Sequence, residues 1–267
     1  EVILATPAQA IHSSIAALAL EAGVSEPTVN RFCRSLETRG FPDFKLHLAQ
    51  SLAHGTLYVN RNVDEDDSVE SYTGKIFESA MASLDQVHHS LDMSAINRAV
   101  DLLTQAKKIA FFGLGSSAAV AHDAMNKFFR FNVPVIYSDD IVLQRMSCMN
   151  CNDDDVVVII SHTGRTKSLV ELAQLAREND AMVIAITSPG TPLSRESTLA
   201  ITLDVPEDTD IYMPMVSRLA QLTVIDVLAT GFTLRRGAKF RDNLKRVKEA
   251  LKESRFDKEL SLHSNDQ

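Results

Sequence analysis

Between about residue 95 and residue 205, short runs rich in Val and Ile alternate with stretches of helical periodicity. This alternation constrains the fold more than any other feature. It predicts a parallel sheet with helices on both faces, because parallel strands need helical crossovers and lie buried on both sides. We therefore expect a doubly wound α/β domain. The predicted strands are Ile109–Phe112, Val133–Tyr137, Val156–Ile160, Met182–Thr187 and Leu199–Val205.

Residues 1–57 have a different pattern, that of short helices joined by tight turns. A helix that begins near Ser14 is followed by Gly23, the residue best suited to a left-handed helix stop. Ser25 is a suitable cap for the next helix, on which apolar residues recur at i, i+3, i+4 and i+7 and face the preceding helix: Val29, Phe32, Cys33 and Leu36. Two capped helices that share one apolar seam indicate a helix-turn-helix, hence an all-α head. Because residues 1–5 resemble the tail of an amphipathic helix, we expect the first helix to be incomplete in this sequence.

The predicted boundaries are a head over 1–57, an acidic linker over 58–68 and the α/β domain over 69–267. A helix over Val69–Leu91 opens the second domain. Its apolar stripe is compatible with packing on its own domain or with a dimer contact, and the pattern does not distinguish them. The stripe consists of Phe77, Ala80, Leu84, Val87 and Leu91. A helical region over Val216–Glu253 closes the chain.

The second helix of the head is the candidate recognition helix. Side chains at its start and on the face opposite the seam are expected to contact double-stranded operator DNA, because early residues of such a helix meet base edges and arginines bind phosphate or guanine. They are Ser25, Glu26, Thr28, Arg31 and Arg34. However, residues 1–56 hold four Lys/Arg against five Asp/Glu, within a net charge of −8. One head offers few phosphate contacts, so we expect a homo-oligomer, at least a dimer.

Two glycine- and hydroxyl-rich loops follow predicted strands and precede helices. The first contains Gly115, Ser116 and Ser117. It also fits the dinucleotide pattern G-x-G-x-x-A, with Asp139 and Asp140 near the expected acidic position, so this loop alone does not separate a nucleotide from a sugar phosphate.

The second loop favours a sugar phosphate. Hydroxyl side chains, a glycine and a helix N-terminus together form a nest for a tetrahedral anion, and a dinucleotide fold has no use for such a loop after its third strand. The expected ligand-binding residues of this loop are Ser161, His162, Thr163, Gly164, Arg165 and Thr166.

These motifs resemble a known family. Residues 13–34 and Phe41–Gln50 resemble the head of the RpiR family of bacterial transcription regulators, and the two loops resemble its SIS (sugar isomerase) domain. The resemblance implies that Ser161, Thr163 and Thr166 hold the phosphate and Ser117 reaches the sugar. A finer match, over residues 25–34 and 206–214, implies a repressor-type regulator of sugar catabolism whose effector is 2-keto-3-deoxy-6-phosphogluconate.

The alternative is a sugar-phosphate isomerase or another phosphosugar enzyme. Enzymes with this domain usually have an acid where this chain has Arg165, and aldose–ketose isomerisation needs a general base. The remaining candidate bases are Glu207, Asp208 and Asp210. We therefore expect a regulator and not an enzyme.

Other sequence features limit the location and the cofactors. Three cysteines form no disulfide framework, which favours a reducing cytoplasm, and Cys148-x-x-Cys151 has no second ligand pair at zinc-binding spacing. His88, His89 and His122 show no ligand spacing, so we expect no metal and no cofactor. No apolar run is long enough for a membrane span.

Overall fold

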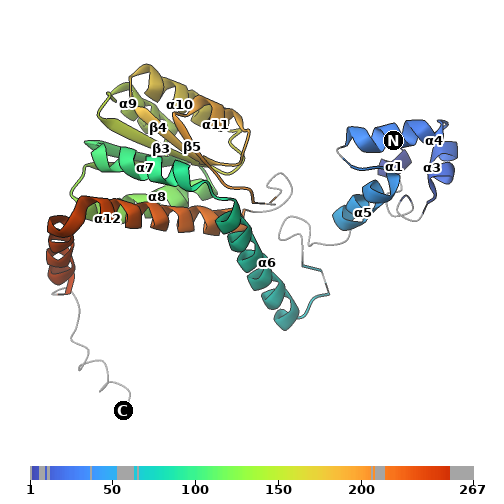
Figure 1. Ribbon diagram of the computed structural model, residues 1–267, viewed down its shortest axis with the longest axis horizontal. Helices are drawn as coiled ribbons and strands as arrows, with labels where there is room; N and C mark the ends of the chain where they lie inside the picture. The colour runs from blue at the N-terminus through green and yellow to red at the C-terminus, as the bar shows by residue number, and fades with distance from the viewer. Residues whose placement is uncertain are drawn as a thin grey trace, which may run out of the picture. The chain divides into compact units, whose positions relative to one another are not determined.

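The computed structural model describes residues 2–5, 10, 13–36, 38–52, 63–64, 66–205, 207 and 214–252. It divides into two compact units (Figure 1). One comprises Glu1–Phe77 with Ile211–Met213, and the other comprises Glu78–Asp210 with Pro214–Gln267.

The first unit contains the helical head. Its helices are α1 (Val2–Ala5), α3 (Ile15–Glu21), α4 (Glu26–Ser35) and α5 (Phe41–Leu52). The hydroxyl of Ser14 caps α3 by accepting from the Ala17 amide, and Gly23, with φ 65°, turns the chain between α3 and α4. These features confirm the helix-turn-helix.

The apolar core of the head is narrower than the sequence pattern predicts. Its buried residues are Leu18, Ala19, Val29, Cys33, Phe41 and Phe44. Phe32 and Leu36, expected in the same seam, are 44% and 50% exposed. Leu36 is exposed because α4 ends at Ser35, so the helical periodicity does not extend to this residue. Phe32 lies at the edge, with its ring 5.9 Å from that of Phe44.

The second unit alternates strands and helices. After α6 (Val69–Ser90), which begins in the first unit, the order is α7 (Met93–Gln105), β1 (Lys108–Gly113), α8 (Ser116–Phe128), η1 (Phe129–Phe131), β2 (Val135–Ser138), α9 (Ile141–Met149), β3 (Asp155–Ser161), α10 (Lys167–Glu178), β4 (Met182–Thr187), α11 (Pro192–Glu196), β5 (Leu199–Thr202) and α12 (Val216–Lys252). All five strands are parallel, in the order β2-β1-β3-β4-β5.

Both faces of the sheet are covered (Figure 1), which confirms the doubly wound α/β prediction. Alternate residues of β3 point to opposite faces: Val158 packs with side chains of α7, α8 and α12, whereas Val157 and Ile159 pack with side chains of α9, α10 and α11. All residues of β3 between Asp155 and Ser161 are apolar, because a strand buried on both faces has no solvent face.

The apolar stripe of α6 divides into two parts. Val87 is buried in the core of the second unit, and Leu84 and Leu91 pack against that core. Phe77, at the start of the stripe, is 66% exposed, and Met81, one turn later and outside the predicted stripe, is 60% exposed. Packing on its own domain therefore explains the second half of the stripe and leaves the first half without a partner in the described chain.

The long helix α12 is interrupted at Gly237, where φ is 77° and ψ is −161°. Beyond the break, Phe240 packs against Phe131 and Phe232, with ring centroids 5.6 and 5.8 Å apart. The sequence predicts one helical region here and misses the break. In the part of the chain that the structure describes, no helix has both the length and the apolar character to cross a membrane.

Candidate functional site

The two loops singled out in the sequence follow neighbouring strands. The Gly113–Ser117 loop follows β1 and the Ser161–Thr166 loop follows β3, and these strands pair in parallel through Gly113 and Ile160. The chain leaves β1 for β2 on one side and returns to β3 on the other, so this edge is the topological switch point of the sheet. Open α/β sheets bind ligands in the crevice at that point.

The β1 loop is held close to α8. A side chain at Gly113 would place its Cβ 2.6 Å from the Ser117 carbonyl oxygen, so only glycine allows this approach. Ser117 lies in the first turn of α8 and is buried, whereas Gly115 is exposed and Ser116 is half-buried. The α8 N-terminus and its hydroxyls thus reach the switch point.

Gln144 of α9 braces the same loop, and the sequence gave no sign of this role. Its side chain is fully buried, and its Nε2 atom donates to the carbonyl oxygens of Gly113, at 3.3 Å, and Ser138, at 2.7 Å. Gln144 therefore ties the end of β1 to the end of β2.

The β3 loop turns tightly around its own hydroxyls. The Ser161 hydroxyl, which is buried, accepts from the Gly164 amide at 3.2 Å, and the Thr163 hydroxyl accepts from the Arg165 amide at 3.4 Å. Each hydroxyl also has a proton that a phosphate oxygen can accept. Gly164 has φ 56°, and a Cβ there would collide with Thr191.

Residues at the end of β4 and in the segment that follows it contact this loop, and sequence reasoning did not identify them. The Ser188 amide donates to the His162 carbonyl oxygen at 2.9 Å, and the Leu193 amide donates to that of Gly164 at 3.1 Å. Thr187 and Thr191, both buried, hydrogen-bond to each other at 3.2 Å. Their position at the end of a third neighbouring strand is the sequence signal that could have led to them, although it does not reveal their contacts with the β3 loop.

His162 joins the β3 loop to two other segments. Its Nε2 atom lies 3.3 Å from the Glu207 carbonyl oxygen, and its Nδ1 atom lies 3.4 Å from the Ser188 hydroxyl. A carbonyl oxygen only accepts, so Nε2 donates and, in the neutral ring, Nδ1 accepts from Ser188. The loop is thereby linked to Glu207, which lies 9 residues before Val216, the first residue of α12.

Glu207 caps the N-terminus of α12. One carboxylate oxygen accepts from the amides of Met215 and Val216, at 2.6 and 2.7 Å, and the other accepts from the amide and hydroxyl of Ser217. These donors occupy the group that the sequence left open as a general base. Asp208 and Asp210, the other two candidates, lie outside the described residues.

Positive charge lies at the start of α10. Arg165 and Lys167 are exposed and flank Thr166, the exposed N-cap residue of that helix. A helix N-terminus and two cations favour a bound anion. The nine residues that the sequence singled out in the two loops therefore all lie at the carboxyl ends of the neighbouring strands β1 and β3.

The candidate DNA-binding residues share the outer face and start of α4. Ser25, Glu26, Arg31 and Arg34 are exposed and Thr28 is half-buried. The Thr28 hydroxyl is 2.9 Å from that of Ser25 and accepts from Arg31 at 3.4 Å. Thr28 thus orients Arg31 across one helical turn, on the side away from Val29 and Cys33.

The cysteine pair lies at a helix end. Cys148 is in the last turn of α9 and Cys151 follows it. Burial raises the pKa of the Cys148 thiol to about 12 and also raises that of Cys151. Both thiols are therefore held in the unreactive protonated form.

Comparison with known proteins agrees with this arrangement. Residues 1–55 match the helix-turn-helix domain of the rpiR family, and residues 102–231 match the SIS domain. The HTH-type transcriptional regulator HexR of Escherichia coli K12 is 90% identical over 266 residues, which cover 100% of this chain and 92% of that protein. HexR of Pseudomonas aeruginosa PAO1 is 57% identical over 256 residues, which cover 96% of this chain and 90% of that protein.

Solved structures share the fold. The Vibrio vulnificus NanR protein complexed with ManNAc-6P superposes with a TM-score of 0.63 at 24% identity, over 96% of this chain and 92% of that one. The sugar isomerase domain of an RpiR transcription factor from Sphaerobacter thermophilus has a TM-score of 0.58 at 17% identity, over 66% of this chain and 98% of that one. The chain belongs to the RpiR family of transcription regulators, as a HexR-type member with a helix-turn-helix head and a SIS domain, and is not an enzyme.

Proposed function

We propose that this regulator binds operator DNA through α4 and that a phosphorylated sugar acid, bound at the switch point of the sheet, controls that binding. The observation that carries the proposal is the meeting of two hydroxyl-lined loops at the ends of the paired strands β1 and β3. The proposed effector is 2-keto-3-deoxy-6-phosphogluconate, and the proposed targets are genes of sugar catabolism.

The phosphate binds at the start of α10. Ser161, Thr163 and Thr166 donate hydroxyl hydrogen bonds, Arg165 adds positive charge, and Gly164 allows the tight turn. His162 orients the loop. The helix N-terminus stabilises the negative charge of a phosphate bound there, because its free amides and the helix dipole favour anions.

The rest of the effector extends toward the β1 loop. Gly115, Ser116 and Ser117 contact its sugar-acid end, because this loop lies beside the β3 loop at the neighbouring strand end. The fold is shared with a NanR protein complexed with ManNAc-6P, which is consistent with a phosphosugar as the class of ligand.

The structural change caused by the bound effector is transmitted beyond the site through His162 and Glu207. A phosphate that pulls on the β3 loop moves the imidazole, whose partner Glu207 caps α12. An effector changes DNA affinity only if it binds one arrangement of the head and the SIS domain more tightly than another. The hydrogen bonds that connect Ser161 and the β3 loop to α12 are contacts that a bound effector can rearrange.

The head binds DNA with Ser25, Glu26, Thr28, Arg31 and Arg34. Its few basic residues require a second head, so the working form is a homo-oligomer, at least a dimer, in the cytoplasm. Phe77 and Met81, the exposed apolar side chains in the first half of α6, contribute to the contact between copies. We assign the head to 1–57, the linker to 58–68 and the effector domain to 69–267.

The experiment is a thermal-shift screen of sugar phosphates on the full chain. A ligand that binds only the folded protein stabilises it by about 2.7 kcal/mol at roughly 100 times Kd. We expect 2-keto-3-deoxy-6-phosphogluconate to raise Tm, and the Ser161→Ala and Ser117→Ala variants to lose the shift.

Thr198→Ala is the matched control. Its hydroxyl, like that of Ser161, accepts from a backbone amide, that of Val183 at 3.1 Å, but at the opposite end of the strands. Thr198→Ala should respond like the wild type. An equal shift in all four proteins would exclude the proposed site, and no shift with any sugar phosphate would contradict the proposed function.

A further inference from the structure

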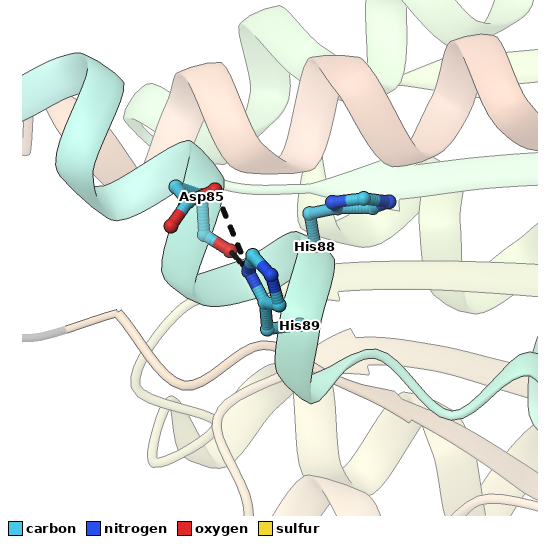
Figure 2. A group of neighbouring side chains, drawn as sticks. All are labelled: Asp85, His88 and His89. Atoms are coloured by element: carbon cyan, nitrogen blue, oxygen red, sulfur yellow. Dashed lines mark hydrogen bonds and ion pairs between the residues drawn. The ribbon is translucent and has the colours of Figure 1, made fainter.

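The last turns of α6 bring together three potential metal ligands that the proposed function does not use. They are Asp85, His88 and His89, and in the described part of the chain no other group of three acidic, histidine or cysteine side chains places its ligand atoms so close (Figure 2). Their spacing is i, i+3 and i+4, which puts a carboxylate one helical turn before two imidazoles. The spacing of the histidines alone does not reveal this group, because its third member is an aspartate.

The ligand atoms of the three side chains lie within 4.8 Å of one another. Figure 2 shows His89 turned toward Asp85, with its Nδ1 atom 3.4 Å from the Asp85 carboxylate and 2.8 Å from the Asp85 carbonyl oxygen. The His88 and His89 rings are 5.3 Å apart. All three side chains are exposed, so rotation about their side-chain bonds can bring the ligand atoms to the separation that a metal requires.

We propose that Asp85, His88 and His89 bind a divalent transition metal such as Zn²⁺. Imidazole nitrogens with one carboxylate suit Zn²⁺, whereas Ca²⁺ and Mg²⁺ prefer oxygen ligands. Three protein ligands leave the fourth position to water. This site is separate from the effector loops and goes beyond the proposed function.

The position on the helix also favours a cation. Helix α6 ends at Ser90, so the three side chains lie in its last two turns, where unpaired carbonyl groups give negative potential. A metal held between Asp85 and His89 bridges one turn and stabilises this helix end. The end matters structurally because Val87, within the same turn, is buried in the core.

A second pair has the same local geometry but no third ligand among the residues that the structure describes. His47 of α5 places its Nδ1 atom 2.8 Å from the Asp43 carbonyl oxygen and 3.7 Å from the Asp43 carboxylate, at the same i, i+4 spacing. If any exposed Asp–His pair bound the metal, the two helices would bind it alike. The pair on α5 is therefore an internal control.

The test is Zn²⁺ binding to the tag-free full chain, stripped of metal, in competition with a chromophoric chelator. We expect one Zn²⁺ per chain. His88→Gln and His89→Gln should each weaken binding by at least about tenfold, because even changes outside the ligand sphere commonly cost about 10–100-fold. His47→Gln should bind like the wild type, and circular dichroism should show unchanged helix content in all three variants.

Three results would overturn the proposal. They are no Zn²⁺ binding by the wild type, unaltered binding by the His88→Gln and His89→Gln variants, and an equal loss in His47→Gln. None of these results bears on the effector site, so failure here leaves the proposed function standing.

Discussion

The imidazole Nε2 of His162 lies 3.3 Å from the backbone carbonyl oxygen of Glu207, and the carboxylate of the same glutamate caps α12. One residue of the proposed phosphate loop therefore contacts the residue that sets the start of the longest helix. A regulator needs such a connection, because a bound effector has to change something outside its own pocket.

Two substitutions of His162 separate its two hydrogen bonds. The Gln side chain places an amide near the position of Nε2, and the Asn side chain places one near that of Nδ1. His162→Gln should keep part of the effector response, whereas His162→Asn should bind the effector but lose most of the change in DNA affinity. Calorimetry measures the binding of the effector, and fluorescence anisotropy measures the change in DNA affinity that the effector causes. Equal responses in both variants would refute a path through Glu207.

Arg31→Ala and Arg34→Ala should weaken operator binding and leave effector binding intact, because both side chains lie on the outer face of α4. Loss of a phosphate contact should lower the salt slope by about one unit, and loss of a base contact should relax one operator position. Arg130→Ala, an exposed arginine of η1, is the control and should bind DNA normally. Unchanged DNA affinity in both α4 variants would disprove the recognition-helix assignment.

Light scattering at micromolar concentration should show at least a dimer. The Phe77→Ser/Met81→Ser double variant should dissociate it, because these side chains are the exposed apolar part of α6. Leu234→Ser, on α12, is the comparison, since Leu234 is 67% exposed and lines a groove between α7 and α12. Dissociation by Leu234→Ser alone would move the interface to that groove, and a monomeric wild type with and without DNA would refute the oligomer.

The ionised Asp67 carboxylate should stabilise the ordered segment at the start of α6 down to an unusually low pH. Hydrogen bonds from Lys75, Ser71 and the Asp64 amide lower the pKa of Asp67 to about 2. The ionised carboxylate therefore stabilises the ordered segment above pH ~4, the ordinary aspartate range, and this stabilisation disappears as the pH falls through about 2. An NMR titration of the Asp67 carboxyl carbon measures the shift.

The Lys75→Met variant should raise the pKa of Asp67 toward its usual value, because Lys75 donates to both carboxylate oxygens at 2.7 and 2.9 Å. Lys127→Met, which removes a lysine paired with Asp226, should leave it unchanged. A midpoint near pH 4 for Asp67 in the wild-type protein would contradict the ion pair.

Much of the fold could be predicted because it depends on local pattern. The apolar runs of β1, β3 and β4 are buried on both faces, and their sequences show this directly. The break at Gly237 could not be predicted, because glycine within a helix has no φ preference of its own and the packing of Phe240 on Phe131 decides the outcome. Leu36 was misplaced because periodicity does not say where a helix ends.

The candidate site, like the fold, could be predicted from the sequence only in part. Ser161 and Gly164 were identifiable because hydroxyls and a glycine at the end of a strand have a physical use there. Gln144 and Ser188 were not, because each acts through contacts with distant segments, 31 residues away for Gln144 and Gly113 and 26 residues away for Ser188 and His162. Only the folded chain brings such partners together.

The central claim is that one site in the SIS domain controls DNA binding by the head. The measurement is fluorescence anisotropy of an operator duplex, selected by the wild-type protein from random-sequence DNA, with and without saturating 2-keto-3-deoxy-6-phosphogluconate. Wild type and Thr198→Ala should change affinity by about 5–150-fold, the usual range of coupling free energies. Ser161→Ala and Ser117→Ala should bind the duplex but show no such change. A full response in both of these variants, or none in the wild type, would contradict the account.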